Sequence, residues 1–324
     1  MIKRPKRVII WGYPLHTHTH SYIHLGYYRA FKALGFETYW SDNVHTIGEE
    51  FNDSLVITEH FATSCLPLSK SSTYFVHYLG NRGNNHEKYL ENVGRLVDLR
   101  YNADCWVDKN YNYTLDRSKV EKIGEGTYYE KGNEYDIAYT TWATDLLPNE
   151  IDLERRFHQR QKKITYVGTV GGGKGGLFDC QKAPDYYDTV PYIMPFYEEC
   201  RKNKIEFETN CPWVSPMRNE EMMNVVMNSY LAPDFRHKAM LDWGYIPCRI
   251  MKNISYGQLG MTNSEAVNRF LNGEVVYNSD SRLLFYEGQN KMNDYDFIKK
   301  SMLQVKEKHT YINRANDILR IYEK

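Results

Sequence analysis

Short apolar segments alternate with helix-like segments along most of the chain, and this alternation constrains the fold more than any other feature. Strand-like residues 8–11 are followed by apolar residues at helical spacing over 22–34, which end at Gly35. Further strand-like segments occupy residues 37–40, 54–58, 73–78 and 137–141. Strands that alternate with helices indicate βαβ units and a parallel sheet. We therefore predict an α/β fold.

The same alternation occurs a second time after a break at residues 143–148 and a charged run. The second half predicts strands at residues 164–168, 206–209, 230–232 and 275–277, helices at residues 192–203 and 220–229, and a helical segment at 295–324. A length of 324 residues is about twice that of an ordinary domain. We expect two Rossmann-like domains that face a cleft, residues 1–148 and 149–305, and a closing helix at 306–324 that packs back.

The composition narrows the class of protein. The chain has 41 Lys and Arg residues and 41 Asp and Glu residues. This balance disfavours a protein that binds bulk nucleic acid or anionic lipid mainly through its charge. No run of 18 apolar residues occurs, and the start of the chain does not read as a signal peptide. The six cysteines are scattered without a Cys-x-x-Cys pair, which favours reduced thiols. We expect a cytoplasmic protein without stable membrane insertion.

A glycine-rich loop follows the strand-like residues 164–168. It approaches the Walker A pattern, but Gly175 stands where a magnesium-binding Ser or Thr is needed, which disfavours a P-loop NTPase. Glycines after a strand let backbone N–H groups approach an anion, and a lysine adds a point charge. A flexible turn without a ligand is the alternative. The predicted anion-binding residues are Gly171, Gly172, Gly173 and Lys174.

A second group of polar residues surrounds a predicted helix that begins near Arg249 and ends at Gly257. Helical spacing places Arg249, Lys252, Asn253 and Tyr256 on one face. The next strand ends at Thr262, Asn263 and Ser264, which open another helix. An arginine beside a helix N-terminus suits a diphosphate. A solvated basic helix face is the alternative.

These residues resemble the donor-binding half of a GT-B glycosyltransferase, especially the CgeB-like branch with its family-1-type architecture. That branch has the pattern R-x-F-E-x-x-A-x-G-x-x-x-x-T, which Arg249, Gly257 and Thr262 match, and a later H-T-Y-x-x-R, which residues 309–314 match. The resemblance covers about residues 160–320, whereas for residues 1–148 it rests on βαβ character alone. It implies a GT-B fold, a nucleoside-diphosphate sugar as co-substrate, most simply a UDP-sugar, and no bound metal or other cofactor.

One position departs from the pattern of this branch. Lys252 stands where the family has a glutamate that holds the ribose of the nucleotide, and a lysine cannot accept hydrogen bonds from the ribose diol. Either another acid holds the ribose, with Asp234, Asp242 and Glu265 as candidates, or Lys252 reaches a phosphate.

Histidines gather after the first strand, where a parallel sheet binds ligands. The candidate catalytic residues are His16, His18 and His20, since a neutral imidazole can serve as a general base for an acceptor hydroxyl. His-x-His spacing also suits a transition metal if the segment is extended, and a surface loop without a chemical role is the third reading. We expect acceptor contacts from His24, Asn81 and Arg82.

Together these features predict a metal-independent glycosyltransferase that moves a sugar from a nucleoside-diphosphate sugar to a hydroxyl of a glycan or polysaccharide. A phage-type DNA glycosyltransferase acting on a hydroxymethylated base is one alternative, which the basic run at residues 3–7 favours and the neutral net charge disfavours. A nucleotide-sugar-binding protein without transfer activity, motivated by Lys252, is the other.

Overall fold

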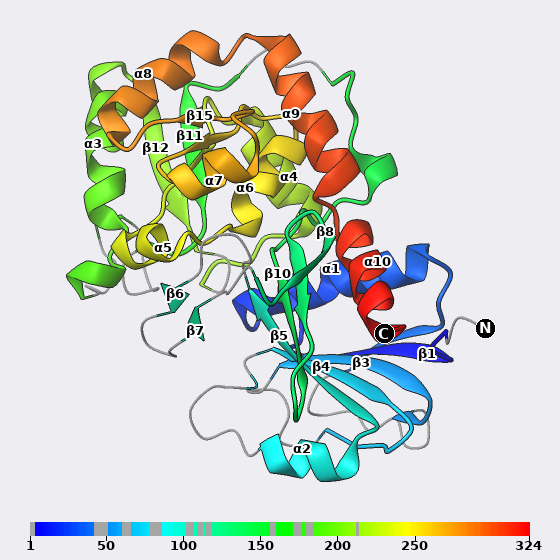
Figure 1. Cartoon of the computed structure of the whole chain (residues 1–324). Helices are drawn as coiled ribbons and strands as arrows, with labels where there is room; N and C mark the ends of the chain where they lie inside the picture. The colour runs from blue at the N-terminus through cyan, green and yellow to red at the C-terminus, as the bar shows by residue number, and fades with distance from the viewer. Residues whose placement is uncertain are drawn as a thin grey trace. The chain divides into compact units, whose positions relative to one another are not determined.

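The computed structural model describes residues 4–41, 51–59, 66–77, 79, 86–101, 107–108, 113–114, 118–155, 160–170, 177–178, 184–211 and 214–324 (Figure 1). The chain forms two compact units. Unit 1 contains Met1–Leu147 and His309–Lys324, and unit 2 contains Pro148–Lys308. The last segment of the chain therefore belongs to the same unit as the first.

A large, mostly parallel sheet organises unit 1. In spatial order its described strands are β2 (Thr38–Ser41), β1 (Arg7–Trp11), β3 (Ser54–Glu59), β4 (Thr73–His77), β5 (Arg95–Tyr101), β10 (Asp136–Thr140), β9 (Thr127–Glu130) and β8 (Glu121–Gly124). The strands from β2 to β10 pair in parallel with their neighbours in this order. Beyond β10, β9 pairs antiparallel with β10, and β8 pairs antiparallel with β9. A separate antiparallel pair is formed by β6 (Val107–Asp108) and β7 (Tyr113–Thr114). The α/β prediction is confirmed.

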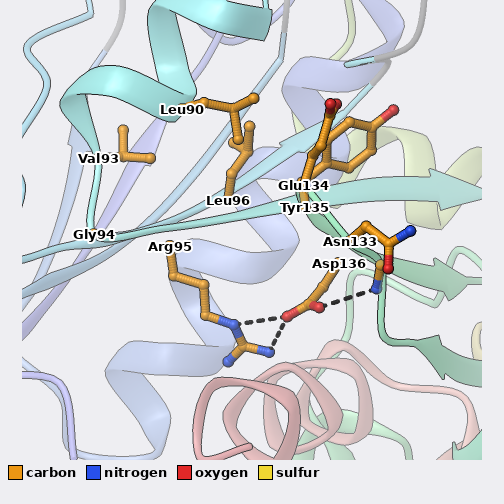
Figure 2. A pocket seen from close by; sticks show the side chains of 10 residues that line it. Leu90, Val93, Gly94, Arg95, Leu96, Asn133, Glu134, Tyr135 and Asp136 are labelled. Atoms are coloured by element: carbon orange, nitrogen blue, oxygen red, sulfur yellow. Dashed lines mark hydrogen bonds and ion pairs between the residues drawn. The ribbon is translucent and has the colours of Figure 1, made fainter.

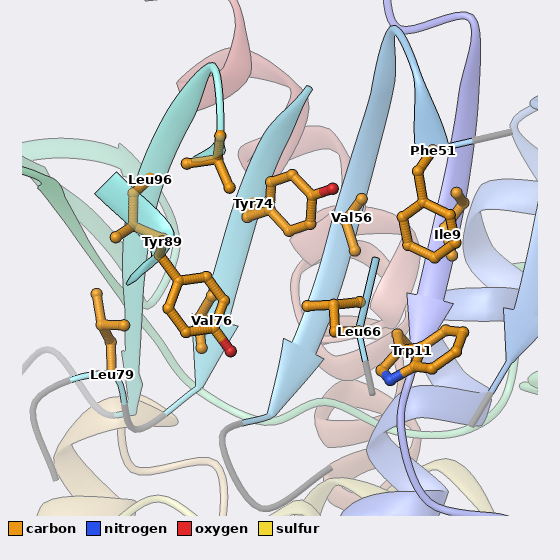
Figure 3. Packing of buried hydrophobic residues seen from close by; sticks show 11 residues of the cluster. Ile9, Trp11, Phe51, Val56, Leu66, Tyr74, Val76, Leu79, Tyr89 and Leu96 are labelled. Atoms are coloured by element: carbon orange, nitrogen blue, oxygen red, sulfur yellow. The ribbon is translucent and has the colours of Figure 1, made fainter. Parts of the chain in front are cut away.

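Strand residues pack on both faces of this sheet, because successive side chains point to opposite sides. Ile9 and Trp11 of β1 join one buried cluster together with Tyr89 of α2 (His86–Asn92), as Figure 3 shows. On the opposite face, α1 (Thr19–Ala33) and α10 (Tyr311–Tyr322) lie side by side (Figure 1). Two covered faces explain why β3 and β4 are buried along their whole length, as is typical of a parallel sheet.

The terminal segment forms two helices instead of the continuous one predicted for residues 295–324. Helix α9 (Tyr295–Lys308) ends before His309, and α10 begins after Thr310, whose backbone N–H donates to Asn313 Oδ1 over 2.9 Å. This capping box starts a new helix and so breaks the old one. Residues 306–308 of the predicted closing helix therefore belong to α9.

The motif at residues 309–314, which carries part of the family resemblance, is buried inside unit 1. Arg314 is fully buried, and its Nε donates to the Thr141 carbonyl over 3.0 Å while its Nη1 donates to the Glu125 carbonyl over 2.7 Å. Its Nη2 lies 3.2 Å from Nδ1 of the buried His309. The arginine and the histidine thus join α10 to the chain beyond β10 and to the β8–β9 turn, which is a structural role.

The described part of unit 2 contains two short parallel sheets and the helices that cover them. One pairs β11 (Lys163–Val167) with β12 (Glu206–Asn210), and the other has the order β13 (Pro233–Asp234), β14 (Met261–Thr262), β15 (Val276–Tyr277). Its described α-helices are α3 (Val190–Lys202), α4 (Asn219–Asn228), α5 (Lys238–Trp243), α6 (Cys248–Ser255), α7 (Glu265–Phe270), α8 (Ser281–Lys291) and α9. The predicted strands at 164–168, 206–209 and 275–277 and the helices at 192–203 and 220–229 are confirmed within a few residues. Among the helices of the described residues, none has the length and apolarity needed to span a membrane.

The strand predicted at residues 230–232 is wrong, although the Tyr230 backbone N–H donates to the Lys163 carbonyl of β11 over 2.8 Å. Ser229 Oγ accepts the backbone N–H of Thr165 over 3.3 Å and donates to the Leu231 carbonyl over 2.7 Å. Side-chain bonds therefore stand beside backbone ones at this place. The strand begins later, as β13.

Candidate functional site

The carboxyl ends of the parallel strands in unit 2 carry a group of charged residues. Asp234 ends β13, and Arg236 follows it by two positions, while Arg249 lies in the first turn of α6. We call Asp234, Arg236 and Arg249 the acid–arginine cluster. Ligands of open α/β sheets bind beyond the carboxyl ends of the strands, so this cluster stands where a ligand is expected.

One carboxylate serves both arginines of the cluster. Asp234 is fully buried, accepts from Arg236 Nε over 3.0 Å and from Arg236 Nη2, and lies 3.7 Å from Arg249 Nη1. Burial alone would lower the pKa of Arg236, but the Asp234 carboxylate outweighs it and raises that pKa. The cluster therefore places two guanidinium groups around one carboxylate, which gives it an excess of positive charge.

Arg249 is the exposed member of the cluster, and its surroundings fix its direction. Its guanidinium lies 4.4 Å from the Tyr166 ring centroid and donates through Nη1 to the Tyr166 hydroxyl. Nη2 of Arg249 lies so close to Gly168 that a Cβ on residue 168 would be 1.7 Å from this nitrogen. The φ of 148° at Gly168 is a second reason for glycine at this position. The side chain of Arg249 is 19% exposed, against 8% for Arg236, so Arg249 is the cation that an anionic ligand can reach.

The other residues predicted on α6 divide between core and surface. The helix itself, with Gly257 at a φ of 90° after its last turn, is confirmed. Tyr256 is fully buried, and Asn253 Nδ2 donates to the Ala232 carbonyl over 2.9 Å, so both contribute to packing. Lys252 is half-buried in the last turn of α6.

The residues predicted after β14 hold the local backbone together. Asn263 exchanges two hydrogen bonds with the Arg236 backbone, at 2.8 and 3.0 Å. Thr262 Oγ1 accepts from the Ser264 backbone N–H over 3.1 Å, and Ser264 Oγ caps α7 through the Val267 N–H. Asn263 thereby fixes the backbone that carries Arg236. The predicted anion-binding residues Gly171, Gly172, Gly173 and Lys174 lie outside the described residues.

The candidate replacements for the ribose-binding glutamate occupy different environments. Asp234 is committed to the cluster. Glu265 is exposed and pairs with Arg269 over 3.1 Å. Asp242 pairs with Lys238 at 2.5 Å and accepts from the Tyr186 hydroxyl over 3.1 Å. Tyr186 contacts Tyr187, which in turn contacts Trp243 and His237, so Asp242 lies beside a group of partly exposed rings.

His237, next to Arg236, makes the start of α5 sensitive to acid. Its Nδ1 accepts the Met240 backbone N–H over 3.3 Å, which a protonated ring cannot do. Burial, followed by the charge of Arg236, lowers the pKa of His237 to about 4.

We expect His237→Asn to reduce the loss of stability between about pH 7 and about pH 5. The folded state depresses the pKa of His237, so the unfolded state binds more protons below about 6.5 and stability falls as the pH drops. At about pH 5 the lowered pKa of His237 reduces the free energy of unfolding by up to about 2 kcal/mol. Asn at this position keeps the helix cap but does not titrate. Urea unfolding of both proteins at the two pH values measures the difference, and parallel pH profiles would contradict the assignment.

The carboxyl ends of the strands in unit 1 carry a second group of residues, built around histidines. His18 caps α1, His20 lies in its first turn, and Glu59 ends β3. His20 Nδ1 lies 2.6 Å from Glu59 Oε2, and the ligand atoms of all three side chains lie within 4.8 Å of one another. We call His18, His20 and Glu59 the histidine–glutamate cluster.

The surroundings of this cluster lower the pKa values of Glu59 and of His18. Burial alone would raise the pKa of Glu59, but the hydrogen bond with His20 and the nearby histidines lower it below its ordinary value. An ionised carboxylate only accepts, so His20 Nδ1 is the donor in the 2.6 Å contact with Glu59 Oε2. Burial, then the charge of His20, lowers the pKa of His18. A carboxylate that orients a histidine in this way suits general-base catalysis.

The remaining histidines differ in their surroundings. His16, at a φ of 68°, places its Nδ1 3.0 Å from the Tyr22 hydroxyl and is not a member of the cluster. His24 is fully buried, burial lowers its pKa to about 4, and its ring lies 6.1 Å from that of His77. A fully buried His24 does not suit the predicted acceptor contact. The other predicted acceptor contacts, Asn81 and Arg82, lie outside the described residues.

Sequence patterns did not reveal Glu59, Arg236 or Trp142. The ring of the buried Trp142 lies 5.8 Å from that of His20, after β10. Glu59 and Trp142 each directly follow a segment predicted as a strand, at 54–58 and at 137–141, so this position was the available signal.

A polar hollow of about 260 Å³ lies at the amino ends of β5 and β10 (Figure 2). Arg95 begins β5 and donates to Asp136 Oδ2 from Nε over 2.8 Å and from Nη2 over 2.5 Å. The same guanidinium donates to the Ile321 carbonyl at the end of α10 over 2.8 Å. Arg95 and Asp136 thus neutralise each other, and the bond from Arg95 to Ile321 connects α10 to the amino ends of the strands.

No protein-family model matches this chain, and no curated protein matches it. Solved structures that it resembles include an apo structure of OtsA, with 8% identity and a TM-score of 0.47, covering 98% of this chain and 99% of that chain. Another is the glycosyltransferase SnogD from Streptomyces nogalater, with 10% identity and a TM-score of 0.41, covering 97% of this chain and 98% of that chain.

Proposed function

We propose that this chain is a GT-B-type glycosyltransferase that uses a nucleoside-diphosphate sugar. The acid–arginine cluster is the observation that carries the proposal. It combines an excess positive charge with a partly exposed Arg249 whose Nη2 faces a glycine. A diphosphate is the anionic part of such a donor, and a bidentate guanidinium matches its oxygens.

The cluster supports a chemical role as well as binding. Departure of the nucleoside diphosphate places negative charge on the phosphate oxygens, and a preorganised cation next to them stabilises that charge in the transition state. Arg236 keeps Asp234 neutralised, so the positive charge of Arg249 remains available for the ligand. The proposed donor chemistry therefore uses protein cations and needs no metal.

The histidine–glutamate cluster supports the second half of the reaction. His20 would accept the proton of the acceptor hydroxyl, and Glu59 would hold the ring in the required tautomer and stabilise the imidazolium that forms. A glycan hydroxyl is the proposed acceptor, because the neutral net charge gives no general attraction to DNA.

Binding of nucleoside diphosphates tests this proposal directly. In EDTA, we expect one of UDP, GDP and ADP to raise the melting temperature. A ligand at about 100 times its dissociation constant adds about 2.7 kcal/mol of stability. Arg249→Ala should weaken that binding about 100-fold, since a charge-assisted bidentate contact contributes about 2–3 kcal/mol.

Two comparisons make this result interpretable. Arg249→Ala leaves Asp234 paired with Arg236, so loss of binding does not have to follow from loss of folding. Arg269→Ala removes an exposed arginine of α7 and should leave affinity unchanged. Binding that survives Arg249→Ala, or that appears only with magnesium and ATP, would reject the donor site. Binding without any release of sugar from the donor would identify a binding protein instead of an enzyme.

A further inference from the structure

The histidine–glutamate cluster has the composition of a metal site as well as that of a catalytic base. Two imidazoles and one carboxylate converge, with ligand atoms within 4.8 Å of one another. The His20 side chain is 12% exposed and that of Glu59 is 1% exposed. Two histidines and a glutamate are a frequent set of three protein ligands for zinc, which leaves a fourth position open.

A second observation, separate from this geometry, also calls for a cation. Glu59 Oε1 is buried, and among the described residues it has no hydrogen-bond partner. The two ring nitrogens of the buried His24 likewise have no hydrogen-bond partner among the residues that the structure describes. Burying an ionised oxygen without a partner costs stability, and a cation bound by Glu59 would remove that cost.

We propose that His18, His20 and Glu59 bind one divalent transition-metal cation of the Zn²⁺ class, and that this cation inhibits the chain. Imidazole ligands favour such metals over Mg²⁺ and Ca²⁺, which prefer oxygen ligands. The inhibition rests on the proposed function, since a cation on either ring nitrogen of His20 removes the neutral ring's role as proton acceptor. Metal binding itself does not depend on that function.

Metal titration of the full chain, free of any histidine tag and stripped with EDTA, tests the binding. We expect one equivalent of Zn²⁺ by calorimetry and one of Co²⁺ by its visible absorption, which reports nitrogen ligands. His18→Asn, His20→Asn and Glu59→Gln should each weaken binding by at least about 100-fold, since even indirect partners of a metal contribute about 10–100-fold. Asn at position 18 keeps a helix cap, so that variant tests the ligand with α1 intact.

His16→Asn provides the matched control, because His16 lies in the same segment and contacts Tyr22 instead of the cluster. Its metal affinity should equal that of the parent chain. Absence of stoichiometric binding, or equal loss of binding in His16→Asn, would overturn the site. If Zn²⁺ binds as expected but does not slow donor turnover, the inhibition and the role of His20 as base are both wrong. Loss of nucleoside-diphosphate binding in Arg249→Ala would still support the donor site in that case, so the two proposals fail separately.

Discussion

His20→Asn is expected to lower the rate constant of sugar transfer by about 10²–10⁴, the usual contribution of a general base. Nucleoside-diphosphate affinity should stay unchanged, because the acid–arginine cluster lies in unit 2. Asparagine keeps a polar side chain near Glu59 but has no basic nitrogen. Release of the nucleoside diphosphate from the sugar donor, followed under single-turnover conditions in EDTA, measures the effect without a bound metal.

Glu59→Gln should produce a smaller loss of rate than His20→Asn, since it removes the orienting charge but leaves the base. Thr17→Ala is the control: Thr17 is exposed, and its hydroxyl donates to the Pro14 carbonyl over 2.6 Å. Its rate should match that of the parent chain. If His20→Asn retains full rate while donor binding persists, the base lies elsewhere and the cluster has no part in proton transfer.

Arg314→Met is expected to lower the free energy of unfolding of unit 1 by about 3–5 kcal/mol, the cost of breaking a buried charged network. Methionine fills most of the volume but leaves the Thr141 and Glu125 carbonyls without their donors. It also removes one of the two arginine charges beside Asp317, which is 4% exposed, and leaves Arg320 at 3.5 Å as the other. Arg314→Lys should recover only part of the loss, because a single ammonium cannot reach both carbonyls in the fork geometry of arginine.

Urea unfolding followed by tryptophan fluorescence measures this change, and Glu323→Gln at the end of the same helix is the control. Glu323 is exposed, so its replacement should cost less than about 1 kcal/mol. If Arg314→Met kept its stability but lost donor binding, the motif at residues 309–314 would have a ligand-binding role instead of the structural one described above.

Runs of apolar residues were enough to predict strands such as β1, β3 and β4, because both faces of the unit 1 sheet are covered there. They did not predict β5, which carries three charged side chains, or the antiparallel strands β8 and β9. Hydrogen bonds of single side chains also changed the outcome: Ser229 bonds to Thr165 and Leu231 beside the strand predicted at 230–232, and the capping box of Thr310 and Asn313 divides the predicted terminal helix. Both effects depend on individual hydrogen bonds, which an apolar pattern does not contain.

The candidate sites were predicted only in part, since their key pairs are distant in sequence. His20 and Glu59 are 39 positions apart, and their pairing depends on the register of β1 and β3. Arg249 was predicted from its position at a helix start, but its contacts with Tyr166 and Asp234 come from two other strands. Residues 309–314 matched a family motif, yet the structure gives them a role in packing that the motif alone could not distinguish from binding.

The return of α10 to unit 1 has a consequence for the order in which the chain is synthesised. The chain leaves unit 1 after Leu147 and re-enters it at His309, where the Thr144 backbone N–H donates to the His309 carbonyl over 3.0 Å. All of unit 2 is therefore made before the ribosome reaches Tyr311, whose side chain packs against Gly26 and Tyr27 of α1. Domains usually fold in order from the N-terminus, but here the segment that completes unit 1 is made after unit 2. Tyr311 therefore covers the side of α1 that carries Gly26 and Tyr27 only after unit 2 has been synthesised.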